Sequence, residues 1–130
     1  MFIEGIGTDI VEIKRIKDIA ERKGFRFLKR LFTDCEIEYC YKGADPFQCL
    51  AARFAAKEAV LKSLGTGLAG CRWTDVEVLR DGLSAPYIVL SGNAADIAGS
   101  KGIEKVLVSI SHDGGMALAF AIAVKGGTGE

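Results

Sequence analysis

One long helix near the middle of the chain limits the possible folds more than any other feature. Asp45 is a favourable N-cap, Pro46 suits the first helical position, and Gln48 completes an Asp-x-x-Gln capping box. Neither proline nor glycine interrupts the residues that follow until Gly65, where a left-handed residue is expected to end the helix. The pattern therefore predicts a helix of about five turns.

The faces of this helix differ. At about 100° per residue, its large apolar side chains form one stripe, made of Phe47, Leu50, Phe54, Leu61 and Leu64. Glu58 lies at the edge of this stripe among small alanines, which let another group come close. A carboxylate in that position is partly desolvated unless a cation meets it.

Two interpretations of the charged residues on this helix stay open from spacing alone. In the first, Glu58 and Lys62 form a surface pair one turn apart while Arg53 and Lys57 are solvated. In the second, Glu58 holds a metal ion and the bases hold phosphate. Asp9, at the end of the first predicted strand, supplies a second carboxylate. Mg²⁺ typically takes one or two carboxylates and fills its other positions with phosphate oxygens and water.

Composition bounds the class of protein. The chain has 130 residues, 49% of them hydrophobic, so we expect one domain over residues 1–125 and a flexible tail at 126–130. No apolar run has the length of a membrane span, and the first residues lack the pattern of a signal peptide. A cytoplasmic location without a membrane partner is therefore expected.

Four cysteines are spread along the chain, at Cys35, Cys40, Cys49 and Cys71. None forms a Cys-x-x-Cys pair, and the single histidine, His112, is remote from them, so a zinc site is not predicted. A disulfide framework is not expected in a cytosolic chain of this size. We expect reduced and mostly buried thiols.

The net charge is zero, but the bases are unevenly spread. Residues 14–30 hold eight bases against two acids, a local charge of +6 that the rest of the chain balances. A basic segment in a neutral protein indicates an acidic partner. Because this segment is small and lacks interleaved exposed aromatic residues, nucleic acid is not the expected partner.

The remaining patterns predict an α+β fold in which an antiparallel sheet packs on the long helix, with additional short helices. Strands are predicted at residues 2–9, 73–80, 87–90, 105–112 and 116–124, and further helices at 10–23, 25–32, 33–42 and 93–101. Gly5 and Gly7 weaken the first strand and indicate close approach of another backbone or a ligand. The last strand is apolar on both faces, so a helix or a second subunit must cover each of them.

Short motifs add little by themselves. Gly5-x-Gly7 lacks the third glycine of a dinucleotide-binding motif, and the glycines around Thr66 lack the Lys-Ser/Thr of a P-loop. His112, at a strand end beside Asp113, is a better catalytic candidate than most single histidines, but no serine is placed to form a triad with it.

Three segments carry a more specific pattern. They read G-I-G-T-D-I-V-E-I-K-R-I at residues 5–16, R-F-A-A-K-E-A-V-L-K-S-L-G-T-G at 53–67 and V-S-I-S-H-D at 108–113. In that order and at those distances they resemble the holo-acyl-carrier-protein synthases, the small bacterial-type branch of the 4′-phosphopantetheinyl transferases. The resemblance spans nearly the whole chain and implies the fold of that family.

The resemblance implies a Mg²⁺-dependent transfer of the 4′-phosphopantetheine group of coenzyme A to a serine of apo-acyl carrier protein, in fatty acid biosynthesis. Adenosine 3′,5′-bisphosphate is then released. The implied metal ligands are Asp9 and Glu58, and Lys62 is implied to stabilise the leaving phosphate. The family is typically a homotrimer with sites at subunit interfaces, which would cover the apolar last strand.

Further roles follow from the same resemblance. Coenzyme A is expected to contact Arg53, Lys57, the backbone of Gly65, Thr66 and Gly67, and His112. The acidic carrier protein is expected to dock on the basic first helix through Lys14, Arg15, Lys17, Arg22 and Arg26.

Some points stay open from the sequence. The general base is Glu58, a metal-bound water or Asp113. Asp113-Gly114-Gly115 stands where many family members have Thr or Ser and a charged residue, which bears on carrier selectivity. The alternative functions are a non-catalytic module that binds an acidic protein, and the same chemistry on peptidyl or polyketide carriers.

Overall fold

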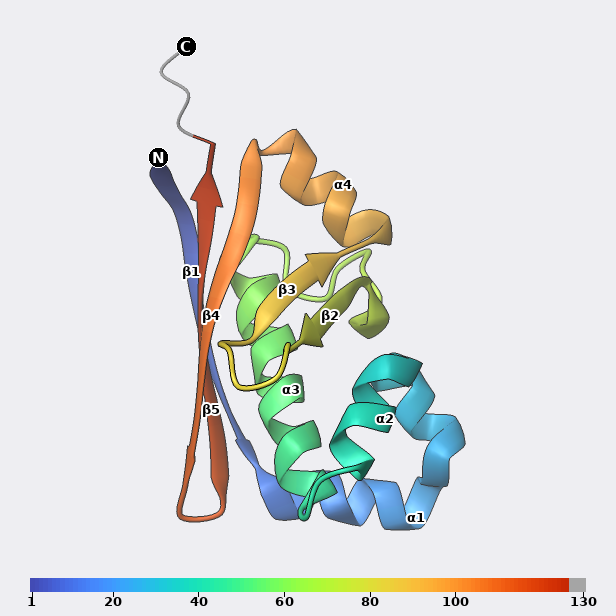
Figure 1. The fold of residues 1–130 in the computed structure, drawn as a ribbon. Helices are drawn as coiled ribbons and strands as arrows, with labels where there is room; N and C mark the ends of the chain where they lie inside the picture. The colour runs from blue at the N-terminus through green and yellow to red at the C-terminus, as the bar shows by residue number, and fades with distance from the viewer. Residues whose placement is uncertain (127–130) are drawn as a thin grey trace.

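The computed structural model describes residues 1–126 and confirms the predicted α+β class. Its elements are β1 (Phe2–Glu12), α1 (Ile13–Leu31), α2 (Asp34–Tyr41), α3 (Pro46–Ser63), η1 (Trp73–Asp75), β2 (Val76–Leu79), β3 (Tyr87–Leu90), α4 (Gly92–Ser100), β4 (Ile103–Asp113) and β5 (Met116–Lys125). A three-stranded antiparallel sheet of order β1-β5-β4 packs on one side of α3, and the β2–β3 hairpin, α1 and α2 lie on its other side (Figure 1).

The long helix, α3, begins and ends as predicted. The Asp45 carboxylate accepts the backbone N–H of Gln48 at 3.1 Å, and Pro46 occupies the first turn. Gly65 follows the helix with a φ of 83°, a left-handed conformation that favours glycine. The Gln48 side chain does not close the capping box, because its Nε2 lies 3.3 Å from Nδ1 of His112.

Small residues on both sides let α3 lie directly on the sheet. Every second residue of β5 in this contact is a buried alanine: Ala117, Ala119, Ala121 and Ala123. On β1, a Cβ added to Gly5 would overlap the carbonyl oxygen of Ser63, and one added to Gly7 would overlap that of Ala59. The close backbone approach predicted from these glycines is therefore confirmed.

The boundary between β1 and α1 differs from the prediction. β1 continues to Glu12, which pairs with Met116, so α1 begins at Ile13 rather than Ile10. Isoleucines at positions 10, 13 and 16 fit a helical period, but pairing with β5 outweighs that local spacing. α1 then runs to Leu31, but Gly24 (φ 74°, ψ −173°) is not helical and divides it into two helical segments, which confirms the predicted break at this glycine.

The other elements lie close to their predicted positions. Gly114 and Gly115, with φ of 56° and 80°, make the tight turn between β4 and β5. Trp73–Asp75 form a 3₁₀ turn rather than the start of β2. Gly126, predicted to begin the tail, donates its N–H to the carbonyl of Gly102 at 3.1 Å. The rest of the predicted tail, at residues 127–130, lies outside the described residues.

The cysteine prediction is wrong for two of the four residues. Cys40, in the last turn of α2, and Cys49, in the first turn of α3, are joined by a disulfide. The short connection between these helices turns the chain back and brings the two turns together, which linear spacing does not reveal. Cys35 is exposed and Cys71 half-buried, so the thiols are also less buried than expected.

The face of the sheet that points away from α3 is apolar. It presents large side chains that are 44–61% exposed in the single chain: Ile6, Ile10, Leu107, Leu118 and Phe120. An apolar face of this kind marks an interaction surface. Within residues 1–126, no helix is long and apolar enough to cross a membrane.

Candidate functional site

Asp9 and Glu58 come together at the edge of the sheet, beside Lys62. The Nζ of Lys62 lies 3.3 Å from Oδ1 of Asp9 and donates to the carbonyl of Thr8 at 3.0 Å. The simpler interpretation, a Glu58–Lys62 surface pair, is not seen among the ion pairs of the described chain. Lys62 is half exposed and belongs to the Asp9 side of the cluster.

Asp9 opposes the ionisation of Glu58. Burial raises the pKa of Glu58, and Asp9 raises it further through its charge and a hydrogen bond. Lys62 and Arg15 act in the opposite direction and lower that pKa. Arg15, predicted to dock a carrier protein, is thus also part of the electrostatic surroundings of this cluster.

This pair of carboxylates fits a magnesium ion. Mg²⁺ prefers oxygen ligands and needs only one or two carboxylates from the protein. A cation between Asp9 and Glu58 would relieve the repulsion that raises the pKa of Glu58. Within residues 1–126, no cluster of three or more His, Cys, Asp and Glu side chains offers a different kind of metal site.

A second set of predicted residues lines a groove on the other side of α3. The groove has a volume of about 720 Å³ and is lined in part by Arg53 and His112. Lys42 and Arg80 also line it. Neither was identified from the sequence, because nothing in the local pattern shows that they meet Arg53. Three cationic side chains and one histidine against one acid, Asp45, make the groove suitable for an anionic ligand.

Arg53 is held in the wall of this groove. Its Nη1 donates to Sγ of Cys49 at 3.1 Å, and its guanidinium carbon lies 4.5 Å from the centre of the Tyr39 ring. Burial lowers the pKa of Arg53, and the charge of Glu36 opposes this effect. The buried Nε of Arg53 has no hydrogen-bond partner within the described residues. A buried donor without a partner costs about 1–3 kcal/mol.

Lys57 lies in the core, and this contradicts its predicted contact with coenzyme A. Its side chain has no exposed surface, and its Nζ lies 2.7 Å from Oε1 of Glu36. The other two ammonium protons are directed at the carbonyls of Trp73 and Val76. Burial lowers the pKa of Lys57, whereas Glu36 raises it. All three hydrogen-bond donors of its ammonium group are satisfied within the protein. Lys57 therefore stabilises the fold and does not contact a ligand.

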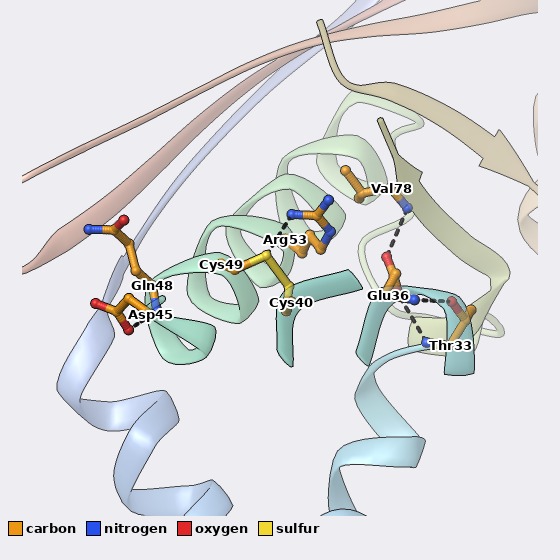
Figure 2. Close-up of a disulfide and its surroundings, with 8 residues drawn as sticks. All are labelled: Thr33, Glu36, Cys40, Asp45, Gln48, Cys49, Arg53 and Val78. Carbon is orange, nitrogen blue, oxygen red and sulfur yellow. Dashed lines mark hydrogen bonds between the residues drawn. A yellow bond between two sulfur atoms is a disulfide. The ribbon is translucent and has the colours of Figure 1, made fainter. Parts of the chain in front are cut away.

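Glu36 completes this buried network. Its carboxylate accepts the backbone N–H of Thr33 and that of Val78, each at 2.8 Å (Figure 2). It therefore ties α2 to β2 as well as to Lys57. The capping box that Glu36 forms with Thr33 is local in sequence, whereas its contacts with Lys57 and Val78 join distant segments.

The glycine turn after α3 lies apart from the Arg53 groove. Gly65 follows Arg53 by twelve residues, about 18 Å along a helix axis. Gly65, Thr66 and Gly67 are thus nearer to Lys62, and the N–H of Gly67 is bonded to the carbonyl of Leu61 at 3.3 Å.

The five predicted docking bases are all exposed, but they do not form one surface. At about 100° per residue, Arg15 and Arg22 share one face of α1 and Lys14 and Lys17 another. The lysines line a groove of about 810 Å³ with three acids from the same region, Glu12, Asp18 and Glu21.

Arg26 lies beyond the kink of α1. It lines a small basic pocket with Lys23, Phe27 and Arg30. Its neighbour Phe25 is 56% exposed, so the expectation that no exposed aromatic residue lies among these bases is wrong.

The carboxylate cluster and the Arg53–His112 groove lie on opposite sides of α3. β1 carries Asp9 and β4 carries His112, with β5 between them. Arg53 and Glu58 are about 140° apart around the axis of α3. A single chain therefore does not join the two sets into one site.

Comparison with known proteins identifies the family of the chain. The 4′-phosphopantetheinyl transferase superfamily matches residues 5–121. A holo-[acyl-carrier-protein] synthase from Desulforudis audaxviator is 52% identical over 122 residues, which are 94% of this chain and 93% of that protein. The crystal structure of such a synthase from Neisseria meningitidis superposes with a TM-score of 0.87 at 35% identity, over 95% of this chain and 100% of that one.

A related structure contains a ligand. The synthase from Helicobacter pylori in complex with coenzyme A superposes with a TM-score of 0.80 at 34% identity, over 92% of this chain and 99% of that one. The fold and these matches define a phosphopantetheinyl transferase, an enzyme. Within that class, the chain belongs to the holo-[acyl-carrier-protein] synthase family, as its three motifs predicted.

Proposed function

We propose that this enzyme transfers the 4′-phosphopantetheine group of coenzyme A to a serine of apo-acyl carrier protein, with Mg²⁺, in fatty acid biosynthesis in the cytoplasm. The observation that carries the proposal is the Asp9–Glu58 pair with Lys62 beside it. Further support comes from the H. pylori relative, which was solved with coenzyme A.

The transfer forms one phosphorus–oxygen bond and breaks another. The serine hydroxyl oxygen attacks the phosphorus that carries the pantetheine arm. The bond from that phosphorus to the bridging oxygen breaks, and this oxygen leaves with adenosine 3′,5′-bisphosphate. The serine proton passes to a base. Mg²⁺, when bound, neutralises phosphate charge and favours in-line geometry.

The residues of the carboxylate cluster divide this work. Asp9 and Glu58 hold the metal, and Lys62 moves from Asp9 to donate to the phosphate as negative charge shifts to the leaving oxygen. Of the candidate bases, Glu58 belongs to this cluster. Asp113 lies at the end of β4 beside His112, which belongs to the second set of residues.

The donor is held, in this proposal, by the second set of residues. Arg53 and His112, with Lys42 and Arg80, bind phosphates of coenzyme A in their groove. The backbone of the glycine turn after α3 contacts the donor near Lys62.

The two sets meet across a subunit interface in a homotrimer. Two observations support this: a single chain separates them by α3, and the outer face of the sheet exposes Ile10, Leu118 and Phe120. The acidic carrier protein docks on the Arg15–Arg22 face of α1, close to the carboxylates.

Mass spectrometry of carrier proteins tests the function. The enzyme is incubated with coenzyme A, Mg²⁺ and a panel of apo-carriers from fatty acid, polyketide and peptide synthesis. We expect the mass gain of one phosphopantetheine on the fatty acid carrier, none on a carrier whose acceptor serine is alanine, and none with EDTA. A mass gain only on peptidyl or polyketide carriers would identify those carriers as the substrate. No mass gain on any carrier would favour a non-catalytic binding module.

A further inference from the structure

The Cys40–Cys49 disulfide lies in the wall of the Arg53–His112 groove. The two cysteines are nine residues apart, and their Cα atoms are separated by 5.3 Å. The bond (Figure 2) closes a ring that contains the whole connection between α2 and α3. Most residues that line the groove belong to this ring or adjoin it, from Tyr39 to Cys49. The shape of the groove therefore depends on how firmly the ring is held.

One sulfur of the bond also contacts the principal base of the groove. Arg53 donates from Nη1 to Sγ of Cys49 at 3.1 Å (Figure 2), while its buried Nε has no partner in the described chain. A guanidinium donor favours the thiolate form of a neighbouring cysteine. Reduction would thus place a negative charge beside Arg53, where it competes with a ligand phosphate.

The two cysteines differ in access. Cys40 is fully buried, whereas Cys49 is half-buried and lines the groove. An external thiol or disulfide therefore reaches Cys49 first, and Cys40 is the resolving cysteine. Disulfides in cytosolic proteins, where they occur, are commonly transient or redox-sensing.

We propose that Cys40 and Cys49 form a reversible thiol–disulfide switch that sets the affinity of the Arg53–His112 groove for its phosphate-bearing ligand. That the ligand is coenzyme A rests on the proposed function. The oxidised form binds more tightly for two reasons: the closed ring holds the groove wall in its binding shape, and Arg53 keeps its charge for the ligand.

The oxidation uses a low-molecular-weight disulfide such as glutathione disulfide. The Cys49 thiolate attacks one of its sulfurs, forms a mixed disulfide and releases one thiolate. The Cys40 sulfur then attacks Sγ of Cys49 and releases the second thiolate. Two electrons pass from the cysteines to the small disulfide, and its two thiolates take up the two protons. Reduction by a thiol runs through the same steps in reverse.

The test uses the Cys35→Ser/Cys71→Ser variant, in which the switch pair supplies the only thiols. Thiol counting after denaturation without reductant should give none after treatment with glutathione disulfide and two after reduction. Titration calorimetry then measures the Kd of desulfo-coenzyme A, which lacks the thiol and cannot exchange with the protein. We expect the Kd to rise about threefold to tenfold on reduction and to return on reoxidation.

A matched control removes the pair itself. The Cys40→Ser/Cys49→Ser variant should have one Kd under both conditions, weaker than that of the oxidised protein, and the KM for apo-carrier should not depend on redox state in either variant. Equal Kd values in the oxidised and reduced forms would overturn the proposal, as would a thiol count that stays at two after oxidation. Because binding is measured without turnover, absence of transfer with a redox-dependent Kd would count against the proposed function alone.

Discussion

Gly7 of β1 lies directly against Ala59 of α3. A Cβ on Gly7 would overlap the carbonyl oxygen of Ala59 and lie 2.9 Å from Cβ of Lys62. Gly7 is two residues before Asp9 on the same side of the strand, and Ala59 is next to Glu58. The contact between this glycine and α3 therefore sets how closely the two carboxylates approach.

Alanine at position 7 is expected to push α3 away from β1. We expect Gly7→Ala to lower the free energy of unfolding by about 1–3 kcal/mol, the usual cost of overpacking. Displaced carboxylates should also reduce kcat by about tenfold or more. Denaturant unfolding and steady-state kinetics measure the two effects.

Gly99→Ala in α4 is the matched control. Nothing lies within 4 Å of a Cβ at Gly99, so this change should leave stability equal or slightly higher. If Gly7→Ala changes stability and kcat as little as Gly99→Ala does, the close approach of β1 and α3 does not position the two carboxylates.

The parts of the fold that the sequence predicted depend on local or steric rules. Asp45, Pro46 and Gly65 mark the ends of α3 through their own backbone preferences, and Gly5 and Gly7 indicate close packing because nothing larger fits. The predicted start of α1 was wrong because the true start depends on the pairing of β1 with β5, a segment more than a hundred residues later. Local spacing contains no information on that partner.

Removing the charge of Glu58 is expected to stabilise the metal-free protein while abolishing transfer. The pKa of Glu58 is raised, so the folded state prefers the neutral carboxyl, and ionised Glu58 costs stability at neutral pH. This cost is absent below the unfolded-state pKa and complete above the folded-state pKa. Glu58→Gln should therefore raise the Tm in EDTA at pH 7 and change it little at pH values below the ordinary pKa of glutamate.

Magnesium should reverse the order of the two Tm values, so that the wild-type protein becomes the more stable one. Mg²⁺ is expected to raise the Tm of the wild-type protein but not that of Glu58→Gln, and kcat of the variant should fall by about 10³-fold or more, since metal stabilisation of phosphate charge contributes several kcal/mol. Thermal unfolding with and without Mg²⁺ provides the comparison. A Tm response to Mg²⁺ that is the same in both proteins would exclude Glu58 as a ligand.

Lys57 is expected to contribute to the stability of the fold and not to the binding of coenzyme A. Lys57→Met leaves the charge of Glu36 buried without its cation, which typically costs about 3–5 kcal/mol. The KM for coenzyme A, measured well below the Tm, should stay within about twofold of the wild-type value because the ammonium does not reach the groove. The second change Glu36→Gln removes the buried charge and should recover part of the lost stability. A large rise in the KM for coenzyme A with little loss of stability would instead indicate that Lys57 contacts coenzyme A.

The role of Lys57 shows what helical periodicity cannot predict. A wheel places Lys57 within the apolar stripe, but its partner Glu36 comes from a different helix and its carbonyl acceptors from residues 73 and 76. The same limit applies to Lys42 and Arg80 of the groove, and to the Cys40–Cys49 bond. Each depends on segments that meet only after folding.

The two faces of α1 should respond differently to charge reversal. Arg22 lies on the face that has Arg15, whereas Lys17 lines a groove that contains five acids. Arg22→Glu is expected to raise the KM for apo-carrier by about tenfold and Lys17→Glu by about twofold or less, with the KM for coenzyme A unchanged in both. High salt should reduce the difference, because exposed charges are screened. Equal effects of the two changes would mean that the carrier does not distinguish these faces.

The outer face of the sheet gives the sharpest test of the proposed trimer. Phe120 is 44% exposed in the single chain and lies on β5, between Thr8 of β1 and Ser109 of β4. A carboxylate there would be buried without a partner in any assembly that covers this face. Phe120→Glu is expected to yield monomers by light scattering and to lower the rate of transfer by about 100-fold or more, because Asp9 and Glu58 then lack a neighbour's Arg53–His112 groove. Leu83→Glu is the control, since Leu83 is fully exposed in the β2–β3 connection and should leave mass and rate unchanged. A monomeric Phe120→Glu protein with full activity would show that one chain suffices, and a trimeric one would place the interface elsewhere.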